Sequence, residues 1–413
     1  MVFNFLAIRF KNIHLPFGIM DTICKASEDP ATAYLPDSRL SLGLEDVYIK
    51  PTRLTYIDGE RGELRYLGYR IEDIISSGAS AEVIQYAFLY GKLPDDSELA
   101  RFRALVEKGY ELPDYVVSSV AALPRSSDVV GMQAVAMASL AAGSDFQWRK
   151  IHMPDTFATM LGQMAAITVI ALRHAMGKEP KLPSPTASYA RSFLVALQDK
   201  EPSDEKVRAL DQAIILYLDH EVPASTTAGL VTVSTLADPY SAVLSALAAL
   251  RGPLHGGATE GVMAQLNEVG EPQAAKEWFE KNVASGKKRL MGFGHRVYKA
   301  YDPRALIFKS IAMKLASEGQ LHKMLTTALA LEQVGLKSLA VKGIYPNADF
   351  YSPIVYASLG IPYAKGAYTA MFALSRTAGW LAHFEEYVQM GGRIIRPRAL
   401  YIGPAPRTLA PKT

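Results

Sequence analysis

The sequence predicts an all-α protein with a large and a small helical domain and one short N-terminal β-hairpin, and three observations support this class. Apolar residues recur at three- and four-residue spacing along most of the chain beyond residue 70. Strand signals are confined to residues 47–66 and do not alternate with helical patterns, as a doubly wound α/β sheet requires. Hydrophobic residues make up 49% and charged residues 21% of the 413 residues, enough apolar material for sizeable cores.

The beginning of the chain divides into an arm and a hairpin. Residues 1–40 show no sustained period and contain several prolines, so we expect an N-terminal arm. Two short apolar and aromatic segments, 54–57 and 64–66, flank a Gly-rich turn at 58–62. This arrangement predicts a β-hairpin.

Helical patterns account for most of the remaining chain. A proline or glycine interrupts the sequence between successive patterns, as at Pro94, Pro124 and Gly177. The expected helices are Ile71–Tyr90, Ser97–Gly109, Asp155–Met176, Asp204–Leu218, Tyr240–Leu250, Gln273–Ala284, Arg304–Glu318 and Tyr363–Gln389.

The composition changes twice in the second half of the chain, near Gly252 and near Gly360. The stretch between holds a lysine-rich segment, Gly-rich turns and shorter helical patterns. We therefore predict a large domain formed by residues 41–254 and 363–413, with a small domain, residues 255–362, inserted into it.

Charge, cysteine content and hydropathy exclude several classes of protein. A net charge of +3 gives no general reason to bind nucleic acid. The single cysteine, Cys24, excludes an intrachain disulfide framework and a cysteine-cluster metal site. The apolar run at 165–172 is too short for the ~20 residues that cross a bilayer, and the N-terminus lacks the pattern of a secretory signal. We expect a soluble, cytoplasmic protein without a metal site.

The first segment that could carry chemistry is residues 251–261. Pro253 stops one helical pattern, and a new one begins after the Gly256-Gly257 pair. His255 would then lie at a helix N-terminus, whose partial positive charge lowers the pKa of a histidine. A neutral imidazole there can donate a hydrogen bond to a developing oxyanion. Taken alone, a capping histidine in a tight turn explains the segment at least as well.

The second segment, residues 287–304, combines two glycines with several cations. Gly292 and Gly294 would leave backbone N–H groups free for a phosphate, and His295 follows them as a possible proton donor. The surrounding cations are Lys287, Lys288, Arg289, Arg296 and Lys299. The pattern is not a P-loop, because no Gly-Lys-Ser/Thr follows at the required spacing. A solvated basic loop is the competing interpretation.

The third segment, residues 342–353, brackets Asp349 between two prolines and aromatic residues. A carboxylate among aromatic side chains is desolvated, which raises its pKa and makes it a better base. The competing interpretation is a helix N-cap, a frequent role for aspartate.

Together and in this order, the segments resemble the citrate synthase family, over about Leu42 to Arg398. The matching motifs are Ile57-Asp-Gly, Leu254-His-Gly-Gly-Ala, Gly292-Phe-Gly-His-Arg-Val-Tyr, Asp302-Pro-Arg304, Tyr345-Pro-Asn-Ala-Asp349 and Arg396-Pro-Arg398. The resemblance implies a mostly helical homodimer whose small domain closes over the substrates. It also implies condensation of acetyl-CoA with oxaloacetate and water to give citrate and CoA, without a permanently bound cofactor.

The resemblance also implies roles for individual residues. His255 matches the histidine that stabilises the enol of acetyl-CoA, Asp349 the base, and His295 the histidine that polarises and protonates the oxaloacetate carbonyl. The groups that bind oxaloacetate's carboxylates would be His220, Arg304 and Arg376, with Arg396 contributed across the dimer interface. The expected CoA contacts are Leu290, Gly292, Gly294, Lys299 and Lys342.

Three other functions compete with this interpretation. A 2-methylcitrate synthase would use propionyl-CoA with the same catalytic groups, and one extra methyl changes binding by only about 1–3 kcal/mol. A non-catalytic helical scaffold would be expected to lack one of the three catalytic residues, and all are present. A nucleotide-binding regulator would need a strand before residues 292–294, where the sequence shows none.

Overall fold

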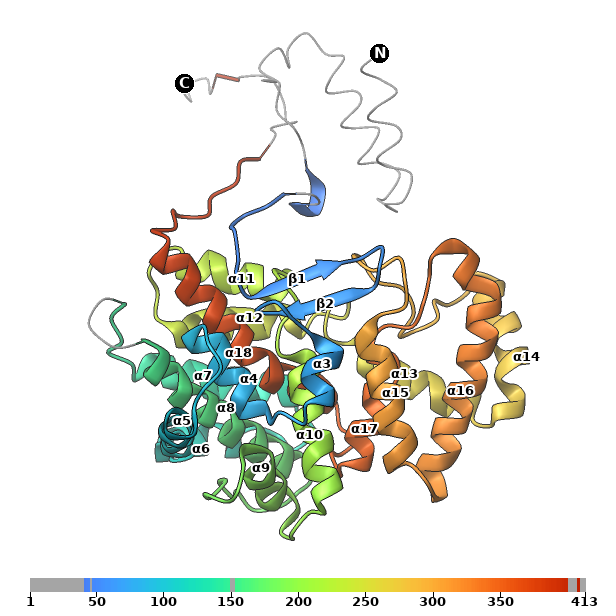
Figure 1. Cartoon of the computed structure of the whole chain (residues 1–413), viewed down its shortest axis with the longest axis horizontal. Coiled ribbons are helices and arrows are strands. Elements are labelled where there is room, and N and C mark those ends of the chain that lie inside the picture. The colour runs from blue at the N-terminus through green and yellow to red at the C-terminus, as the bar shows by residue number, and fades with distance from the viewer. Residues whose placement is uncertain (1–40, 45–46, 149–152, 400–406, 409–413) are drawn as a thin grey trace, which may run out of the picture. The chain divides into compact units, whose positions relative to one another are not determined.

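The computed structural model describes residues 41–44, 47–148, 153–399 and 407–408 (Figure 1). The predicted arm, residues 1–40, and Cys24 within it lie outside the described residues. Backbone contacts divide the chain into two compact units, residues 1–51 with 396–413, and residues 52–395. The strands and α-helices between residues 55 and 389 all lie in the second unit.

The predicted hairpin is confirmed and belongs to a small antiparallel sheet in the order β1 (Thr55–Asp58), β2 (Glu63–Tyr66) and β3 (Tyr69–Arg70). Its register pairs Thr55 with Tyr66. The hairpin turn lies against a loop from the second half of the chain, because the carbonyl of Gly59 accepts the N–H of Lys299 at 2.9 Å. A Cβ at residue 59 would lie 2.2 Å from the carbonyl oxygen of Val297, so only glycine fits there.

All other regular elements within the described residues are helical, which confirms the all-α class. The α-helices up to the first predicted domain boundary are α3 (Ile71–Ser76), α4 (Ala81–Tyr90), α5 (Asp96–Lys108), α6 (Asp114–Ala121), α7 (Val129–Ala142), α8 (Met153–Ala175), α9 (Tyr189–Gln198), α10 (Asp204–Tyr217), α11 (Ala224–Val233) and α12 (Pro239–Leu250). The later ones are α13 (Ala258–Val269), α14 (Ala275–Phe279), α15 (Pro303–Leu315), α16 (Gly319–Leu339), α17 (Ser352–Ser358) and α18 (Ala367–Gln389).

One predicted helix is wrong in its extent, and several observed helices were not predicted. The expected helix 71–90 is two helices, because Gly78 adopts a left-handed conformation with φ of 74° between them. The helices α7 and α11 escaped prediction because they consist largely of Ala, Val, Thr, Ser and Gly, with little contrast between apolar and polar faces. The amphipathic helix α16 was also missed.

The apolar run at 165–172 is by itself too short to cross a membrane, but the helix that contains it, α8, is longer than the run. It begins at Met153, well before the apolar run, and its 23 residues are long and apolar enough to cross a bilayer. However, 78% of its most apolar window is buried inside the protein, where α8 packs against α5, α7 and α18. Burial of this kind is typical of the central helix of a packed core.

The core is centred on α18, which is buried along nearly its whole length and packs against α7, α8, α10, α11 and α12. Figure 1 shows α13, α14, α15 and α16 grouped together to the right of these helices, in yellow and orange. The predicted division into residues 41–254 with 363–413 and residues 255–362 stays a prediction.

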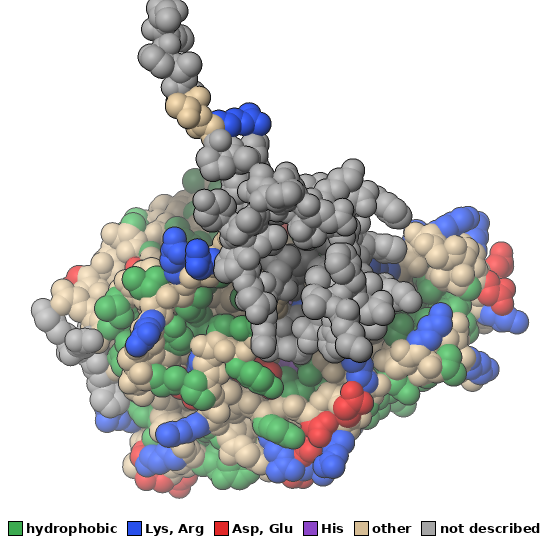
Figure 2. All heavy atoms as spheres, turned by 90° about the horizontal axis from the view of Figure 1, so that it is seen from above, with side chains coloured by type: hydrophobic (Ala, Val, Ile, Leu, Met, Phe, Trp, Pro, Cys, Tyr) green, Lys and Arg blue, Asp and Glu red, His purple; other side chains and the backbone are tan. Residues whose placement is uncertain are grey.

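On the face shown in Figure 2, acidic and basic side chains are interspersed rather than segregated by sign.

Candidate active site

His255 lies in the loop between α12 and α13, two residues before the N-cap Gly257, so its predicted place at a helix N-terminus is confirmed. Its Nε2 accepts the backbone N–H of Ser225 at 3.3 Å and lies 2.9 Å from the Ser225 hydroxyl oxygen. Because Nε2 is an acceptor, the neutral ring carries its proton on Nδ1. Burial, assisted by the positive charge of Arg376, lowers the pKa of His255 to about 4. The ring is therefore a neutral Nδ1–H donor at pH 7.

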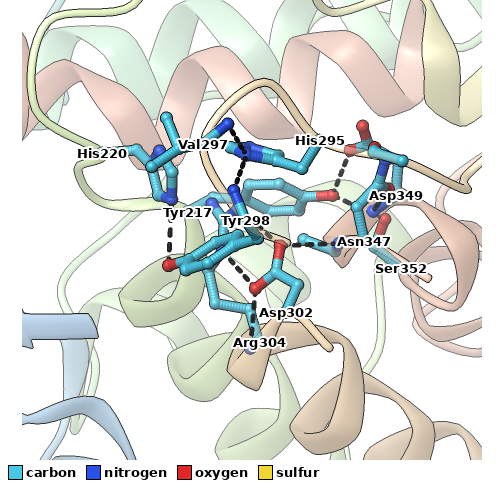
Figure 3. Close-up of polar contacts among 12 residues, drawn as sticks. Tyr217, His220, His295, Val297, Tyr298, Asp302, Arg304, Asn347, Asp349 and Ser352 are labelled. Carbon is cyan, nitrogen blue, oxygen red and sulfur yellow. Dashed lines mark hydrogen bonds and ion pairs between the residues drawn. The ribbon is translucent and has the colours of Figure 1, made fainter. Parts of the chain in front are cut away.

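His295 has the opposite tautomer. Its Nδ1 accepts two backbone N–H groups, from Val297 at 3.0 Å and from Tyr298 at 3.2 Å (Figure 3). The proton of the neutral ring must then lie on Nε2. Burial and the nearby Arg304 lower the pKa of His295 to about 4. The turn that follows Gly294 therefore fixes the Nε2–H of His295 as a second neutral hydrogen-bond donor.

His220 lies just beyond the end of α10 and close to His295, with 5.0 Å between the ring centroids. The hydroxyl of Tyr298 lies 3.2 Å from the Nε2 of His220, so Tyr298 contacts one histidine through its side chain and the other through its backbone. Burial and the charge of Arg304 hold the pKa of His220 well below its usual value. Sequence reasoning overlooked Tyr298, although it ends the motif that contains His295.

Asp349 lies in a 3-10 turn (Ala348–Phe350), and its contacts exclude the N-cap interpretation. The capping side chain is Asn347, whose Oδ1 accepts the N–H of Asp349 at 2.9 Å. The carboxylate Oδ1 of Asp349 accepts the hydroxyl proton of Tyr217 instead, at 2.6 Å. Burial raises the pKa of Asp349 to about 6, against the lowering effect of that hydrogen bond. The raised pKa agrees with the prediction, but the contacting aromatic residue comes from α10 and not from the neighbouring sequence.

The two arginines predicted to bind carboxylates are both buried. Arg304 forms a two-point ion pair with Asp302, at 3.0 Å and 2.7 Å, which keeps the pKa of Arg304 above its usual value despite burial. Arg376 donates from Nε to the backbone carbonyl of Tyr217 at 2.7 Å, and its guanidinium lies over the ring of Phe372. Burial lowers the pKa of Arg376 to about 10, so it too is charged at pH 7. Asp302 balances the charge of Arg304, whereas Arg376 contacts a carbonyl and an aromatic ring, so a buried cation beside neutral histidines favours an anionic ligand.

The second glycine loop is built differently from the prediction. Gly294 does not offer a free N–H, because it donates to the carbonyl of Tyr345 at 2.8 Å. The loop forms a β-bridge with the segment before Asp349, through residues 293 and 346. The side chain of Asn347 adds a hydrogen bond from Nδ2 to the carbonyl of Gly294 at 2.8 Å. The glycines therefore hold the loops of His295 and Asp349 side by side, which sequence reasoning missed.

The remaining predicted CoA contacts differ in exposure, and their role stays a prediction. Leu290 is buried, whereas Lys299 and Lys342 are exposed. Lys288 pairs with Glu268 at 2.6 Å rather than joining a cationic cradle. Arg396 is exposed and begins the stretch that belongs to the other compact unit, so its predicted role stays a prediction.

The arrangement suits proton abstraction from carbon beside a carbonyl group. A partly buried carboxylate with a raised pKa can act as the base, and neutral histidines can donate to developing oxyanions. Among the described residues, no group of three His, Cys, Asp or Glu side chains is placed to hold a metal ion.

Comparison with known proteins agrees with this chemistry. The family model "Citrate synthase, C-terminal domain" matches residues 43–398. The chain is 55% identical to a citrate synthase of Thermoplasma acidophilum over 90% of its length and 97% of that protein. It is 48% identical to a citrate synthase of Saccharolobus solfataricus over 89% of its length and 97% of that protein.

Two solved structures are similar over nearly the whole chain. A ternary complex of carboxymethyl coenzyme A and oxaloacetate with the Thermoplasma acidophilum citrate synthase superposes with a TM-score of 0.88, at 55% identity, covering 90% of this chain and 98% of that chain. A citrate synthase from Pyrobaculum aerophilum superposes with a TM-score of 0.83 at 38% identity, and the match covers 91% of this chain and 96% of that chain.

Proposed function

Because the chain belongs to the citrate synthase family, we propose that it joins the acetyl group of acetyl-CoA to oxaloacetate and hydrolyses the thioester, releasing citrate and CoA. Acetyl-CoA is a co-substrate, and the reaction of this family uses no permanently bound cofactor. One observation carries the residue assignments. A carboxylate with a raised pKa and two neutral histidines of opposite tautomer lie within the electrostatic influence of two buried arginines.

The first step is formation of the enolate of acetyl-CoA, the conjugate base of its enol. Asp349 takes a proton from the methyl carbon, and the electrons of that C–H bond form the new C=C bond. Negative charge then develops on the thioester oxygen, where the Nδ1–H of His255 donates a hydrogen bond. A neutral imidazole is suited to this task, because its acidity is closer to that of an enol than an imidazolium's is.

In the second step the enolate carbon attacks the ketone carbon of oxaloacetate. The Nε2–H of His295 polarises the ketone oxygen and supplies the proton that it gains as the C–C bond forms. Arg376, Arg304 and His220 bind the two carboxylates of oxaloacetate, with each charge-assisted hydrogen bond contributing about 1.5–3 kcal/mol. Water then attacks the thioester carbon, the C–S bond breaks, and CoA leaves as the thiol with a proton from that water. The proton held by Asp349 returns through solvent to His295, which restores both residues.

The proposal includes a homodimer and closure of the small domain. Arg396 is exposed in the single chain, as expected of a residue that acts on the active site of a second subunit. Closure is supported by the contacts of Tyr217 with Asp349 and of His220 with His295, which join residues of the two predicted domains. A cytoplasmic location, expected from the single cysteine, stays a prediction.

A thiol-release assay tests the proposed function. Purified protein is mixed with oxaloacetate and either acetyl-CoA or propionyl-CoA, and free CoA is measured over time. We expect acetyl-CoA to give the higher kcat/KM. A preference for propionyl-CoA would contradict the acetyl-CoA assignment, and no thiol release with either substrate would contradict the catalytic proposal as a whole.

A further inference from the structure

Tyr217 connects the proposed base to one of the proposed oxaloacetate arginines. We infer that it is a positioning residue that orients Asp349 and favours the ionised carboxylate. This inference rests on the proposed function, since that proposal makes Asp349 the base.

The hydroxyl group of Tyr217 lies in a short chain of hydrogen bonds (Figure 3). It is 2.6 Å from the Oδ1 of Asp349 and 2.8 Å from the Oγ of Ser352. An ionised carboxylate only accepts hydrogen bonds, so the single hydroxyl proton of Tyr217 points to Asp349. Ser352 must then donate to the oxygen of Tyr217, and the chain runs from Ser352 through Tyr217 to Asp349.

The tyrosine ring is held firmly enough to fix the direction of that hydrogen bond. Tyr217 is the last residue of α10 and is 1% exposed. Its ring stacks on Phe372 of α18, with centroids 4.5 Å apart, and contacts Phe308 of α15 at 5.2 Å. Its backbone carbonyl accepts the Nε of Arg376 at 2.7 Å. Two helices therefore set the position of the hydroxyl group that meets the base.

The orientation of the Asp349 carboxylate depends on which of its two oxygens accepts a hydrogen bond. Oδ1 of Asp349 accepts the hydroxyl of Tyr217, and no side chain or backbone group of the described residues donates to Oδ2. Oδ2 is therefore the oxygen available to take the methyl proton. A hydrogen bond to the ionised form of a carboxylate lowers its pKa and opposes the effect of burial.

Tyr217 itself does not transfer a proton. Burial and the neighbouring charge of Asp349 hold the pKa of Tyr217 well above its ordinary value. The O–H bond therefore stays intact while Oδ2 gains the methyl proton. The hydrogen bond weakens as Asp349 becomes neutral, so the contribution of Tyr217 is to the ionised state that starts the step.

The test is the pH dependence of kcat/KM for acetyl-CoA in Tyr217→Phe, which keeps the ring and the backbone carbonyl. We expect the acidic limb, near the Asp349 pKa of about 6 in the wild type, to move upward by roughly one pH unit. Oxaloacetate affinity should stay within about two-fold, because the Arg376 contact is to the backbone. Ser352→Ala should move the limb in the same direction by a smaller amount, since it removes only the donor to Tyr217.

Tyr356→Phe is the matched control. It removes a buried tyrosine hydroxyl of α17 that makes no hydrogen bond to Asp349 within the described residues, so its pH profile should match the wild type. An unshifted acidic limb in folded Tyr217→Phe would overturn the inference, as would a loss of oxaloacetate affinity equal to that of Arg376→Gln. If Tyr217→Phe does not fold, an unshifted limb in Ser352→Ala decides against it.

Failure of the proposed function would be seen separately, as absence of thiol release by the wild type. The inference is then tested by infrared titration of the Asp349 carboxyl band, identified by its loss in Asp349→Asn. An equal midpoint in the wild type and Tyr217→Phe would again refute it.

Discussion

Replacing Asp349 by Asn should make the protein more stable and almost inactive. Asn has nearly the same shape as Asp and keeps an oxygen at Oδ1, so the hydrogen bond from Tyr217 can persist. What changes is the charge. Loss of a general base lowers turnover by about 10²-fold or more, which corresponds to at least about 2.7 kcal/mol in the activation barrier.

The gain in stability follows from the pKa of the carboxylate. The pKa of Asp349 rises from 3.8 to about 6 on folding, because burial disfavours the charged form. A shift of about two units costs roughly 3 kcal/mol of folding free energy at pH 7. The sign is destabilising: the cost is absent below pH 4, grows as pH rises from about 4 to 6, and is complete above that range. Asn removes the cost, so the stability difference at pH 5 should be roughly half of that at pH 7.5.

Thermal and urea unfolding at the two pH values, beside the thiol-release assay, measure both effects. Asp211→Asn is the control, because burial also raises the pKa of Asp211, to about 7, while its carboxylate accepts the N–H of Ala81 rather than a hydrogen bond from a proposed catalytic residue. That variant should also gain stability at pH 7.5, with unchanged turnover. Turnover of Asp349→Asn within ten-fold of the wild type would refute the role of Asp349 as the base. No gain in stability would refute the argument from desolvation.

Three further predictions concern the loops, the dimer and closure. Gly292→Ala should lower both stability and turnover, because Gly292 has φ of 78° and a Cβ would lie 2.8 Å from the Cα of Phe350; a wild-type melting temperature would contradict this. Arg304→Gln and Arg396→Gln chains, each nearly inactive alone, should regain activity when subunits are exchanged, since one site of the mixed dimer is intact; verified exchange without recovery argues against a shared site. A non-reactive oxaloacetate analogue should tighten acyl-CoA binding in calorimetry, because a dianion bound to both predicted domains stabilises the closed form, and equal affinities would exclude the closure model.

The helical class and the three loops proposed to carry the catalytic residues could be predicted because each depends on local sequence. Pro and Gly mark where helical patterns break, and titratable residues such as His255 and Asp349 stand at those breaks. Helix α7 could not be found in this way, since its residues are mostly small or apolar all round.

The contacts between loops could not be predicted, because they join residues far apart in the chain. Tyr217 and Asp349 are 132 positions apart, and nothing near either residue indicates the other. The wrong expectation for Gly294 has the same origin. A flexible glycine is visible in the sequence, but the carbonyl of Tyr345 that occupies its N–H is brought there only by the fold.

The side chain of Asn347 has a consequence for the timing of the reaction. Its two ends join the backbone of Asp349 to the loop before His295, so the proposed base and the group proposed to activate the ketone are tied to each other. In the proposed closure both groups therefore reach the substrates together. Under the proposed mechanism acetyl-CoA is then deprotonated where the ketone of oxaloacetate is already polarised, and the enolate meets its electrophile as it forms.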